Sequence, residues 1–437
     1  MRKSGFTLIE LMVAMVIGLT AITSVYSLGA AMSRQFYEEQ RVATSQGTSR
    51  VAIMELRRDV SRAGLFGSPN GNLEPTCDAT PPSLPMLGGG TGPMGAFQYY
   101  ADEDQSVLNP NGKNNVVADR LRILTSLYLT DQLLVHSASI DGATIVLQSG
   151  NQAYRRTFSW GQTAGPFTSG SAPTYLTGDL DWNSAWGGET ASWKGIAQKG
   201  ARAFQTGSVL HIETDHGRHF FRSVFGKSGN TQDEVRLQIT PALPVGTACL
   251  PGAAEGATVA PLQWVEYAVV DPFDETEVGA DFMDFEGMFY IDLDPTNPAY
   301  QLKDAGASPF EAPNRVLVRR LLDSTTGDPK LNSTQVVAEF VSNFQVSFLL
   351  DTNSGSATAP TLSGSSNETT INANPNQVRS VIIDLGVRSP IEDPTLDYAS
   401  NTDAGTRFEV NDAQAGSARV RHMHIEIPVM NVARKNL

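Results

Sequence analysis

The first sixty residues of the chain contain no proline and show one change in hydrophobic pattern. From Phe6 to Met32 the residues are nearly all apolar, and the only charged side chain among them is Glu10. A helix rises 1.5 Å per residue, so a run of this length can cross the ~30 Å hydrocarbon core of a bilayer. Beyond Ser33 the pattern is amphipathic, with apolar residues at spacings of three and four. We expect one helix with a membrane half at 6–32 and an amphipathic half at 33–63 that continues into the head.

The amphipathic half of this helix has one apolar face and one basic face. An apolar stripe on a helix is buried when it packs on another layer, so we expect this stripe to lie on the head. The stripe consists of Ile53, Leu56, Val60 and Ala63, and the opposite face carries Arg50, Arg57, Arg58 and Arg62.

Residues 64–437 contain short alternating or β-branched segments bounded by turn residues, which is typical of strands. This pattern predicts an α+β head with an antiparallel sheet and an additional β-rich lobe or insertions. Three stretches read as irregular: 72–115, an aromatic and Gly/Ser-rich insertion at about 151–200, and a polar loop at about 351–377. The expected strands span 119–124, 132–136, 143–148, 234–239, 263–270, 287–291, 315–321, 335–350, 378–387 and 422–428, with a hairpin at 208–225.

Charge is distributed unevenly between the helix and the head. Residues 1–63 carry eight Lys/Arg and five Asp/Glu, a balance of +3, and subtracting this from the total of −14 leaves −17 for residues 64–437. An acidic head repels phosphate backbones, so nucleic-acid binding is not expected. Solubility of an exported domain is the ordinary explanation for the acidity.

The order of features at the N-terminus distinguishes this chain from one with an ordinary secretory signal. Arg2 and Lys3 form a short basic leader, and the small residue Gly5 precedes the apolar run instead of following it as a signal-peptide cleavage site would. A carboxylate inside a membrane helix costs on the order of 2.5–3.5 kcal/mol on insertion scales, so Glu10 indicates a functional contact. Cleavage after Gly5 would create an amine on Phe6 that could pair with Glu10 of a neighbouring subunit.

The segment Gly5-Phe6-Thr7-Leu8-Ile9-Glu10 resembles the processing site of type IV prepilins and of the pseudopilins of type II secretion. The resemblance implies that residues 1–5 are a leader, which a prepilin peptidase removes after Gly5. It implies that Phe6 is the N-methylated new terminus and that Glu10 acts in assembly. It also implies a pilin-like fold, with 6–32 in the inner membrane before assembly and in the filament core afterwards.

The C-terminal part carries a second resemblance. NFQVSFLLD, a polar loop, VRSVIIDLGVRS and the ending NVARKNL together resemble the PilW-type minor pilins and their relatives, the J-type pseudopilins. The resemblance implies a structural subunit that primes type IV pilus assembly and sits near the filament tip at the cell surface. Its partners would be other minor pilins, the major pilin, the assembly platform and a PilY-type tip adhesin. The alternative is a J-type pseudopilin at the tip of a secretion piston, although the chain length favours the pilus.

Two cysteines, Cys77 and Cys249, occur in the whole chain. The head of an exported protein lies in an oxidising compartment, and neither cysteine has a neighbouring Cys or His of the kind that metal sites use. We expect a disulfide between them, with two buried free thiols as the alternative.

Several polar clusters invite a metal hypothesis, but each has a simpler explanation. Since His216 falls in the expected turn of the 208–225 hairpin, the potential ligands there diverge, and we expect a solvated hairpin without a metal. A calcium loop is the alternative to a proline-containing turn near residue 294, where the closing glutamate of a calcium motif is missing. The residues concerned are His211, Glu213, Asp215, His216 and His219 in the hairpin, His422 and His424 on the last strand, and Asp292, Asp294 and Asn297 in the turn.

Large aromatic residues are concentrated in the 151–200 insertion, where they could form a small core of their own or a binding patch for protein or glycan. The chain has no Gly-x-Ser-x-Gly, Walker, dinucleotide-binding or His-Glu-x-x-His motif. We therefore expect no catalysis and no cofactor. The aromatic residues are Tyr154, Trp160, Tyr175, Trp182, Trp186 and Trp193.

Overall fold

The structure is a computed structural model that describes a large part of the chain. The described residues are 8–71, 73, 74, 94–101, 114, 117–129, 131–148, 153, 203–231, 234–247, 250, 252, 254–270, 315–330, 333–353, 359–389, 398, 406–409 and 416–433.

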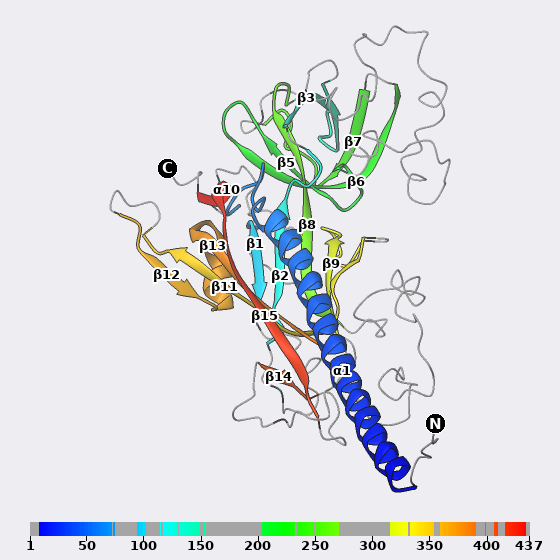
Figure 1. Cartoon of the computed structure of the whole chain (residues 1–437). Helices are drawn as coiled ribbons and strands as arrows, with labels where there is room; N and C mark the ends of the chain where they lie inside the picture. The colour runs from blue at the N-terminus through cyan, green and yellow to red at the C-terminus, as the bar shows by residue number, and fades with distance from the viewer. Residues whose placement is uncertain are drawn as a thin grey trace, which may run out of the picture.

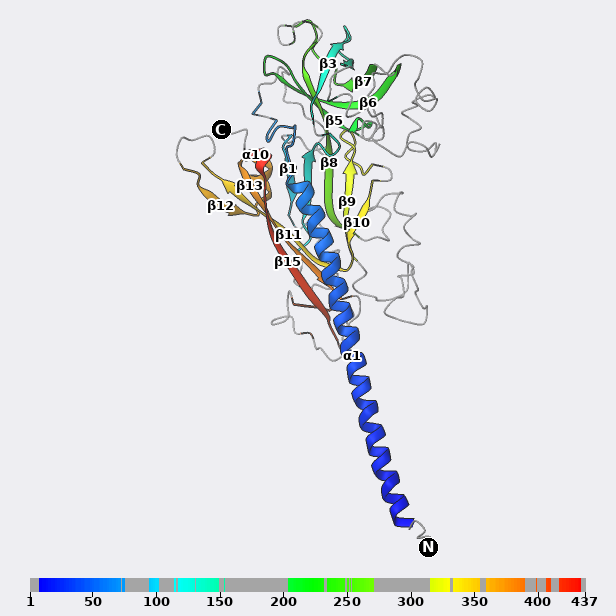
Figure 2. The same cartoon turned by 45° about the horizontal axis from the view of Figure 1, so that its top comes forward.

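A single long helix, α1 (Leu8–Val60), dominates the N-terminal part of the chain and spans 53 residues. Its lower half extends away from the rest of the molecule, whereas its upper half lies against the sheets (Figures 1 and 2). The helix ends in a run of turns, and Gly64 (φ 71°) donates its N–H to the Leu124 carbonyl at 2.9 Å. Glycine adopts this left-handed conformation without strain. The expected uninterrupted helix is thus confirmed over the residues described.

The larger sheet has ten strands, all paired antiparallel, and its longest strands are β6 and β8. β8 joins two halves of the sheet, because its residues 258–262 pair with β5 and its residues 263–270 pair with β2 and β9. Figure 1 shows the upper half above the end of α1 and the lower half beside the helix. The strands are β1 (Phe97–Tyr100), β2 (Arg120–Thr125), β3 (Leu133–Ala138), β4 (Thr144–Leu147), β5 (Val209–Glu213), β6 (His219–Thr231), β7 (Glu234–Thr240), β8 (Thr258–Val270), β9 (Val316–Leu322) and β10 (Gln335–Ala338).

The second sheet has five antiparallel strands in the order β12-β11-β13-β15-β14. Short helical segments connect β12 to β13 and follow β15. The strands are β11 (Val341–Asp351), β12 (Leu362–Ser365), β13 (Val378–Arg388), β14 (Arg407–Phe408) and β15 (Ala418–Pro428), and the helical segments are α8 (Glu368–Ala373), the 3-10 turn η3 (Pro375–Gln377) and α10 (Met430–Ala433).

The main hydrophobic core lies where the two sheets meet the upper half of α1. Alternate residues on β11 and β13 point into it, as the pleat of a strand requires. Phe348 of β11 makes edge-to-face contacts with Phe97 and Tyr99 of β1, with ring centroids 5.9 and 5.2 Å apart. The upper half of the larger sheet has a second core, which includes Phe204 and Phe220. The two sheets and the helix therefore form one packed body.

One side chain of α8 covers the outer edge of β1 by bonding the backbone N–H and C=O that a neighbouring strand would otherwise bond. Asn372 accepts the Tyr99 N–H at 2.8 Å and donates its own amide to the Tyr99 carbonyl, also at 2.8 Å. An open sheet edge presents unpaired backbone groups that favour aggregation, so this contact protects the edge. Asn367 caps α8 by accepting the Thr370 N–H at 2.9 Å, which is an N-cap contact typical of asparagine.

Most expected strands coincide with observed ones to within a few residues, but three expectations were wrong in part. The stretch 72–115 contains β1, and the polar loop expected at 351–377 contains β12, α8 and η3. The strand expected at 335–350 is broken into β10 and β11 by a turn at Phe340, whose φ of 55° is rare for a bulky residue. The strand expected at 287–291 lies outside the described residues. A long helix followed by an antiparallel body is consistent with a pilin-like α+β fold.

Candidate functional site

The apolar half of α1 does not pack against the head. Its window Leu11–Gly29 has 19 residues and a mean hydropathy of 2.0, and none of it is buried in the molecule. By length and composition alone, this segment can cross a membrane. Thr20, Thr23, Ser24 and Ser27 turn their hydroxyls back onto carbonyls one turn earlier at 2.8–2.9 Å. Hydroxyls bonded in this way can face hydrocarbon without an unpaired polar group.

The processing residues lie at the very start of the chain. Gly5 and Phe6 fall outside the described residues, and Glu10 lies in the first turn of α1. Cleavage after Gly5, methylation of Phe6 and an assembly role for Glu10 therefore stay predictions. The same holds for the disulfide, since Cys77 and Cys249 are also outside the described residues.

The upper half of α1 packs on strands of both sheets, including β2, β10, β13 and β15. The stripe expected from the sequence is the buried side, since Leu56, Val60 and Ala63 are fully buried and Ile53 is nearly so. Burying a Leu, Ile or Val side chain contributes about 1.5–3 kcal/mol each, so this stripe attaches the helix firmly. The arginine face opposite is exposed.

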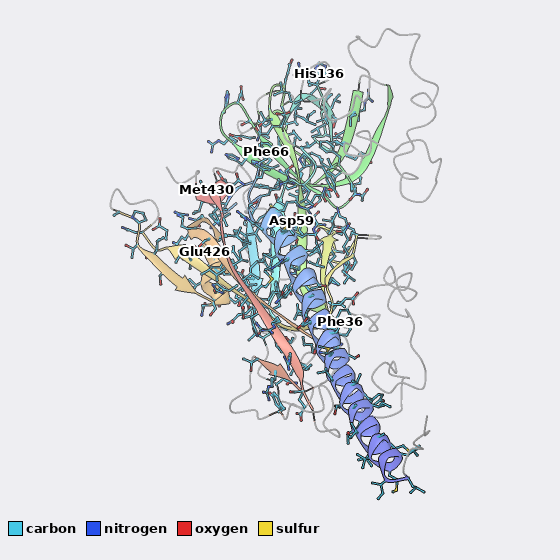
Figure 3. All side chains as sticks on the ribbon, in the orientation of Figure 1. Phe36, Asp59, Phe66, His136, Glu426 and Met430 are labelled. Carbon is cyan, nitrogen blue, oxygen red and sulfur yellow. The ribbon has the colours of Figure 1, made fainter. Side chains whose placement is uncertain are left out.

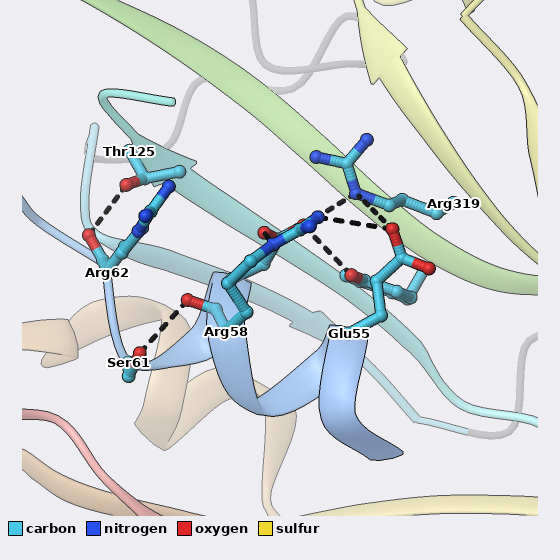
Figure 4. Close-up of polar contacts among 8 residues, drawn as sticks. Glu55, Arg58, Ser61, Arg62, Thr125 and Arg319 are labelled. Carbon is cyan, nitrogen blue, oxygen red and sulfur yellow. Dashed lines mark hydrogen bonds and ion pairs between the residues drawn. The ribbon is translucent and has the colours of Figure 1, made fainter. Parts of the chain in front are cut away.

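An ion pair inside this interface joins α1 to the larger sheet. The fully buried Asp59 carboxylate accepts hydrogen bonds from Arg319 Nε on β9 at 2.6 Å and from the Tyr267 hydroxyl on β8 at 2.9 Å. Arg58 Nε donates to its other oxygen at 3.2 Å, and Glu55 lies 3.8 Å from Arg319 (Figure 4). Figure 3 places Asp59 on the part of α1 that lies within the body. The joint is thus a carboxylate from the helix held by two side chains of the sheet.

The protonation of this joint follows from its charges. Burial and the Asp59 carboxylate both raise the pKa of the Tyr267 hydroxyl well above its ordinary value. Burial is the largest single effect on the Arg319 guanidinium and lowers its pKa, but Asp59, Tyr267 and Glu55 together outweigh burial and the net shift of the pKa is upward. Tyr267 therefore stays a neutral donor and Arg319 stays charged across the physiological pH range.

A second buried ion pair lies on the opposite face of the same strands. Glu266 on β8 is fully buried and accepts from Arg122 Nε of β2 at 2.6 Å and Arg320 Nε of β9 at 2.7 Å. Burial alone would raise the pKa of the Glu266 carboxyl, but the arginines outweigh it and lower this pKa to about 2. Arg122 also donates to the Tyr100 hydroxyl at 2.8 Å. This row of side chains ties three neighbouring strands together.

Two of the three histidines of the β5–β6 hairpin are buried, so the expectation of a solvated hairpin was wrong in part. His211 and His219 are buried, their rings are nearly parallel (5°) with centroids 5.2 Å apart, and Nε2 of His211 lies 2.9 Å from Nδ1 of His219. His211 Nδ1 contacts the Phe66 carbonyl oxygen at 2.7 Å, and His219 Nε2 lies 3.4 Å from Glu74 Oε2. Phe66 and Glu74, which follow α1 in the chain, thus both contact this face of the hairpin.

Within the described residues, no group of three or more His, Asp, Glu or Cys side chains is arranged to hold a metal. His216 lies exposed in the turn, away from the buried pair, and its ring contacts Asp215 at 3.2 Å. On β15, His422 contacts the Asp384 carboxylate at 2.9 Å. The calcium candidates Asp292, Asp294 and Asn297 and the aromatic residues of the 151–200 insertion are outside the described residues.

Comparison with known families finds one match. Residues 1–26 match the prokaryotic N-terminal methylation motif, which is the processing signal of prepilin-type proteins. The motif indicates a type IV pilin or pseudopilin. No curated protein and no solved structure matches the chain significantly.

The methylation motif suggests a structural, non-enzymatic subunit. The motif and the exposed apolar half of α1 fit a pilin-family protein that is anchored in the membrane before assembly and then joins other subunits. The motif also implies processing by a prepilin peptidase.

Sequence reasoning missed Asp59, although a signal for it existed. Asp59 follows Leu56 by three positions and precedes Val60, so it lies on the buried side of the helix. A charged residue within an apolar stripe is almost never fully buried without a partner. The partner could not be named, because Arg319 lies 260 positions further along the chain.

Proposed function

We propose that this protein is a PilW-like minor pilin, a structural subunit that primes assembly of a type IV pilus and sits at or near the filament tip. The observation that carries the proposal is the methylation motif at 1–26, which overlaps the start of the unbroken helix α1. The apolar half of this helix can lie in a membrane, and its other half is packed on the head. Such a helix can leave the membrane and enter a filament without any change in the head.

The size of the head supports a place at the tip. Residues 64–437 amount to 374 residues, which is large for a unit repeated along a helical shaft. A subunit at the tip has neighbours on one side only, so a bulky head meets fewer steric limits there. In this position the head could help to present a PilY-type adhesin, and its neighbours would be other minor pilins and the major pilin.

The alternative is a J-type pseudopilin at the tip of a type II secretion piston, since the methylation motif is common to both classes. The two functions differ in where the mature protein is found. We would search by targeted mass spectrometry for the mature N-terminal peptide in sheared surface filaments and in the envelope fraction. An N-methylated Phe6 in sheared filaments supports the pilus, whereas an intact Met1 terminus in every fraction overturns both alternatives.

The role of Glu10 can be tested separately. A carboxylate is expensive in a membrane helix, so Glu10→Ala should insert at least as well as the wild type but fail to assemble. The matched control is Glu39→Ala, which removes an acid from the same helix outside the apolar half. The amount of the subunit in sheared filaments, relative to the envelope, is the measurement. Normal incorporation of the Glu10→Ala protein would show that this acid has no part in assembly.

A further inference from the structure

The face of α1 that points away from the sheets carries apolar side chains as well as arginines. Val51 is 58 % exposed and Met54 is 63 % exposed, although both lie on the half of the helix that packs on the head. The buried stripe is on the other side of the helix, where Leu56 and Val60 are fully buried. A surface helix normally turns a polar face to water. The upper half of α1 therefore has two faces with apolar side chains, and the head covers one of them.

The exposed apolar residues of the upper half are aligned with apolar residues lower on the helix. An α-helix has 3.6 residues per turn, so residues 18 positions apart point in the same direction. Phe36 and Met54 have this spacing, and Phe36 is also exposed (Figure 3). Val25 and Met32 are exposed within about 40° of that direction. One apolar stripe thus runs along the outer side of α1, and aligned exposed apolar residues of this kind indicate an interaction site.

Four exposed arginines border the upper part of this stripe, two on each side. Around the helix axis they lie about 40–80° from Met54, at about 100° per residue. Arg58 is paired with the neighbouring Glu55 at 3.2 Å. In the described part of the chain, no carboxylate forms an ion pair with the side chains of the other three. The four are Arg50 and Arg57 on one side, and Arg58 and Arg62 on the other.

This arrangement is unfavourable in the separate chain. Arg58 and Arg62 are four positions apart, and like charges at this spacing destabilise a helix. Val51 and Met54 expose apolar surface that burial would stabilise. A partner that supplies both carboxylates and apolar surface removes both costs. Arginine and methionine are also enriched where proteins bind one another.

We propose that Val51, Met54 and the four arginines form a docking surface for a neighbouring prepilin-type subunit, whose contact surface has an apolar centre flanked by carboxylates. Charge complementarity supports this occupant. Residues 1–63 carry a balance of +3 and residues 64–437 a balance of −17, so a subunit with a head like this one offers many carboxylates. Arginine binds a carboxylate through two parallel hydrogen bonds. The proposal rests on the proposed assembly function, but not on the position of the subunit in the filament.

A membrane surface fits the arginines less well than a protein does. The segment that can cross a membrane ends at Gly29, and Arg50 follows it by 21 positions, or about 32 Å along the helix. Electrostatic attraction is largely screened beyond about 8 Å at physiological ionic strength. While the apolar half of α1 spans a bilayer, the arginines are therefore too far from the lipid headgroups to bind them.

The test is photo-crosslinking in cells that produce the full chain. Met54 is replaced by p-benzoylphenylalanine, and in a control the same amino acid replaces Phe225, which is 50 % exposed on β6. Mass spectrometry identifies the crosslinked peptides. We expect an adduct at position 54 with a subunit that carries the N-terminal methylation motif, and we expect Asp or Glu residues in its crosslinked peptide. The Phe225 position should not give this adduct.

Charge reversal tests the arginine border. Arg50→Glu combined with Arg57→Glu should lower the yield of the position-54 adduct about tenfold, because the carboxylates of the partner then face like charges. The matched control is Arg218→Glu combined with Arg236→Glu, which changes the net charge equally at two exposed arginines of the larger sheet and should leave the yield unchanged. Because Arg57 lies in the last turn of the helix, Arg50→Glu alone is made as well and should lower the yield in the same direction.

Each outcome decides the proposal. An adduct with lipid, an adduct with a protein that lacks the motif, or an equal loss of yield in the two double variants would overturn it. The N-terminal peptide in the same samples separates this proposal from the proposed function. An intact Met1 terminus in every fraction overturns both. A processed Phe6 terminus without an adduct at position 54 overturns the docking surface alone.

Discussion

The buried pair between Asp59 and Arg319 makes a sharp prediction about how the helix is attached to the head. Asp59→Ala leaves the Arg319 guanidinium, whose side chain is 9 % exposed, without its partner at 2.6 Å. It also leaves the Tyr267 hydroxyl without its acceptor. Removing one member of a buried ion pair costs about 3–5 kcal/mol. The gain in helix propensity from Asp to Ala returns at most about 0.7 kcal/mol.

The magnitude can be checked by urea unfolding of the full chain in detergent micelles. With a slope of ~2–3 kcal/mol per M, the midpoint should fall by about 1–2 M. Arg58→Ala is the matched control, since Arg58 also contacts the Asp59 carboxylate but its side chain is 53 % exposed. An exposed ion pair is worth ~0–1 kcal/mol, so this variant should change the midpoint little.

The double variant Asp59→Leu with Arg319→Met replaces both members of the buried ion pair. Replacing both members of a buried pair by apolar residues of similar size is often neutral, so the double variant should be more stable than Asp59→Ala. If Asp59→Ala costs no more than Arg58→Ala, or if the double variant is the least stable of all, then this ion pair does not hold the helix to the sheet.

Two further predictions concern the body. Asn372→Ala removes both hydrogen bonds that cover the edge of β1 and should destabilise the protein by about 1–3 kcal/mol. Thr369→Ala, on the exposed side of α8, is the control. An equal urea midpoint for the two variants would contradict the role of Asn372. The carboxyl of Glu266 has its pKa lowered from 4.5 to about 2, so it stabilises the fold above pH ~4.5 by about 3 kcal/mol, and this contribution is lost as the pH falls through about 2. The difference in unfolding free energy between the wild type and Glu266→Gln should therefore shrink from pH 5 towards pH 3, and a constant difference would show that Glu266 is not the titrating group.

The local pattern of apolar and polar residues was sufficient to predict the helix and most strands. Spacings of three and four between Ile53 and Ala63 gave the buried side of α1, because a helix brings such residues to one face. The hairpin at 208–225 was predicted from two alternating runs around a turn at Asp215–Arg218, and β5 and β6 flank that turn. In both cases neighbouring residues alone determine the structure.

Contacts between distant segments were not predictable in the same way. β8 pairs with β5 over one half of its length and with β2 and β9 over the other half, and no pattern within β8 marks the change. The burial of His211 and His219 depends on residues 66–74 folding back over the hairpin. The break at Phe340 depends on a left-handed backbone that bulky residues seldom adopt. Tertiary packing decides all three.

The continuous helix α1 and the ion pair at Asp59 together determine where Glu10 lies around the helix axis relative to the head. Asp59 lies 49 positions after Glu10, or about 74 Å along the axis at 1.5 Å per residue, and α1 is continuous throughout. In a continuous helix each residue is turned by about 100° from the last, so the place of Glu10 around the axis follows from the place of Asp59. Asp59 is hydrogen-bonded to Tyr267 on β8 and Arg319 on β9. The buried apolar stripe opposes rotation of the helix about its own axis. If Glu10 pairs with the terminus of a neighbouring subunit, as the sequence predicts, then the orientation of the head in the filament is set by the joint at Asp59. A prepilin-type subunit with a large head needs such a joint, because a head that could turn about the helix would collide with its neighbours.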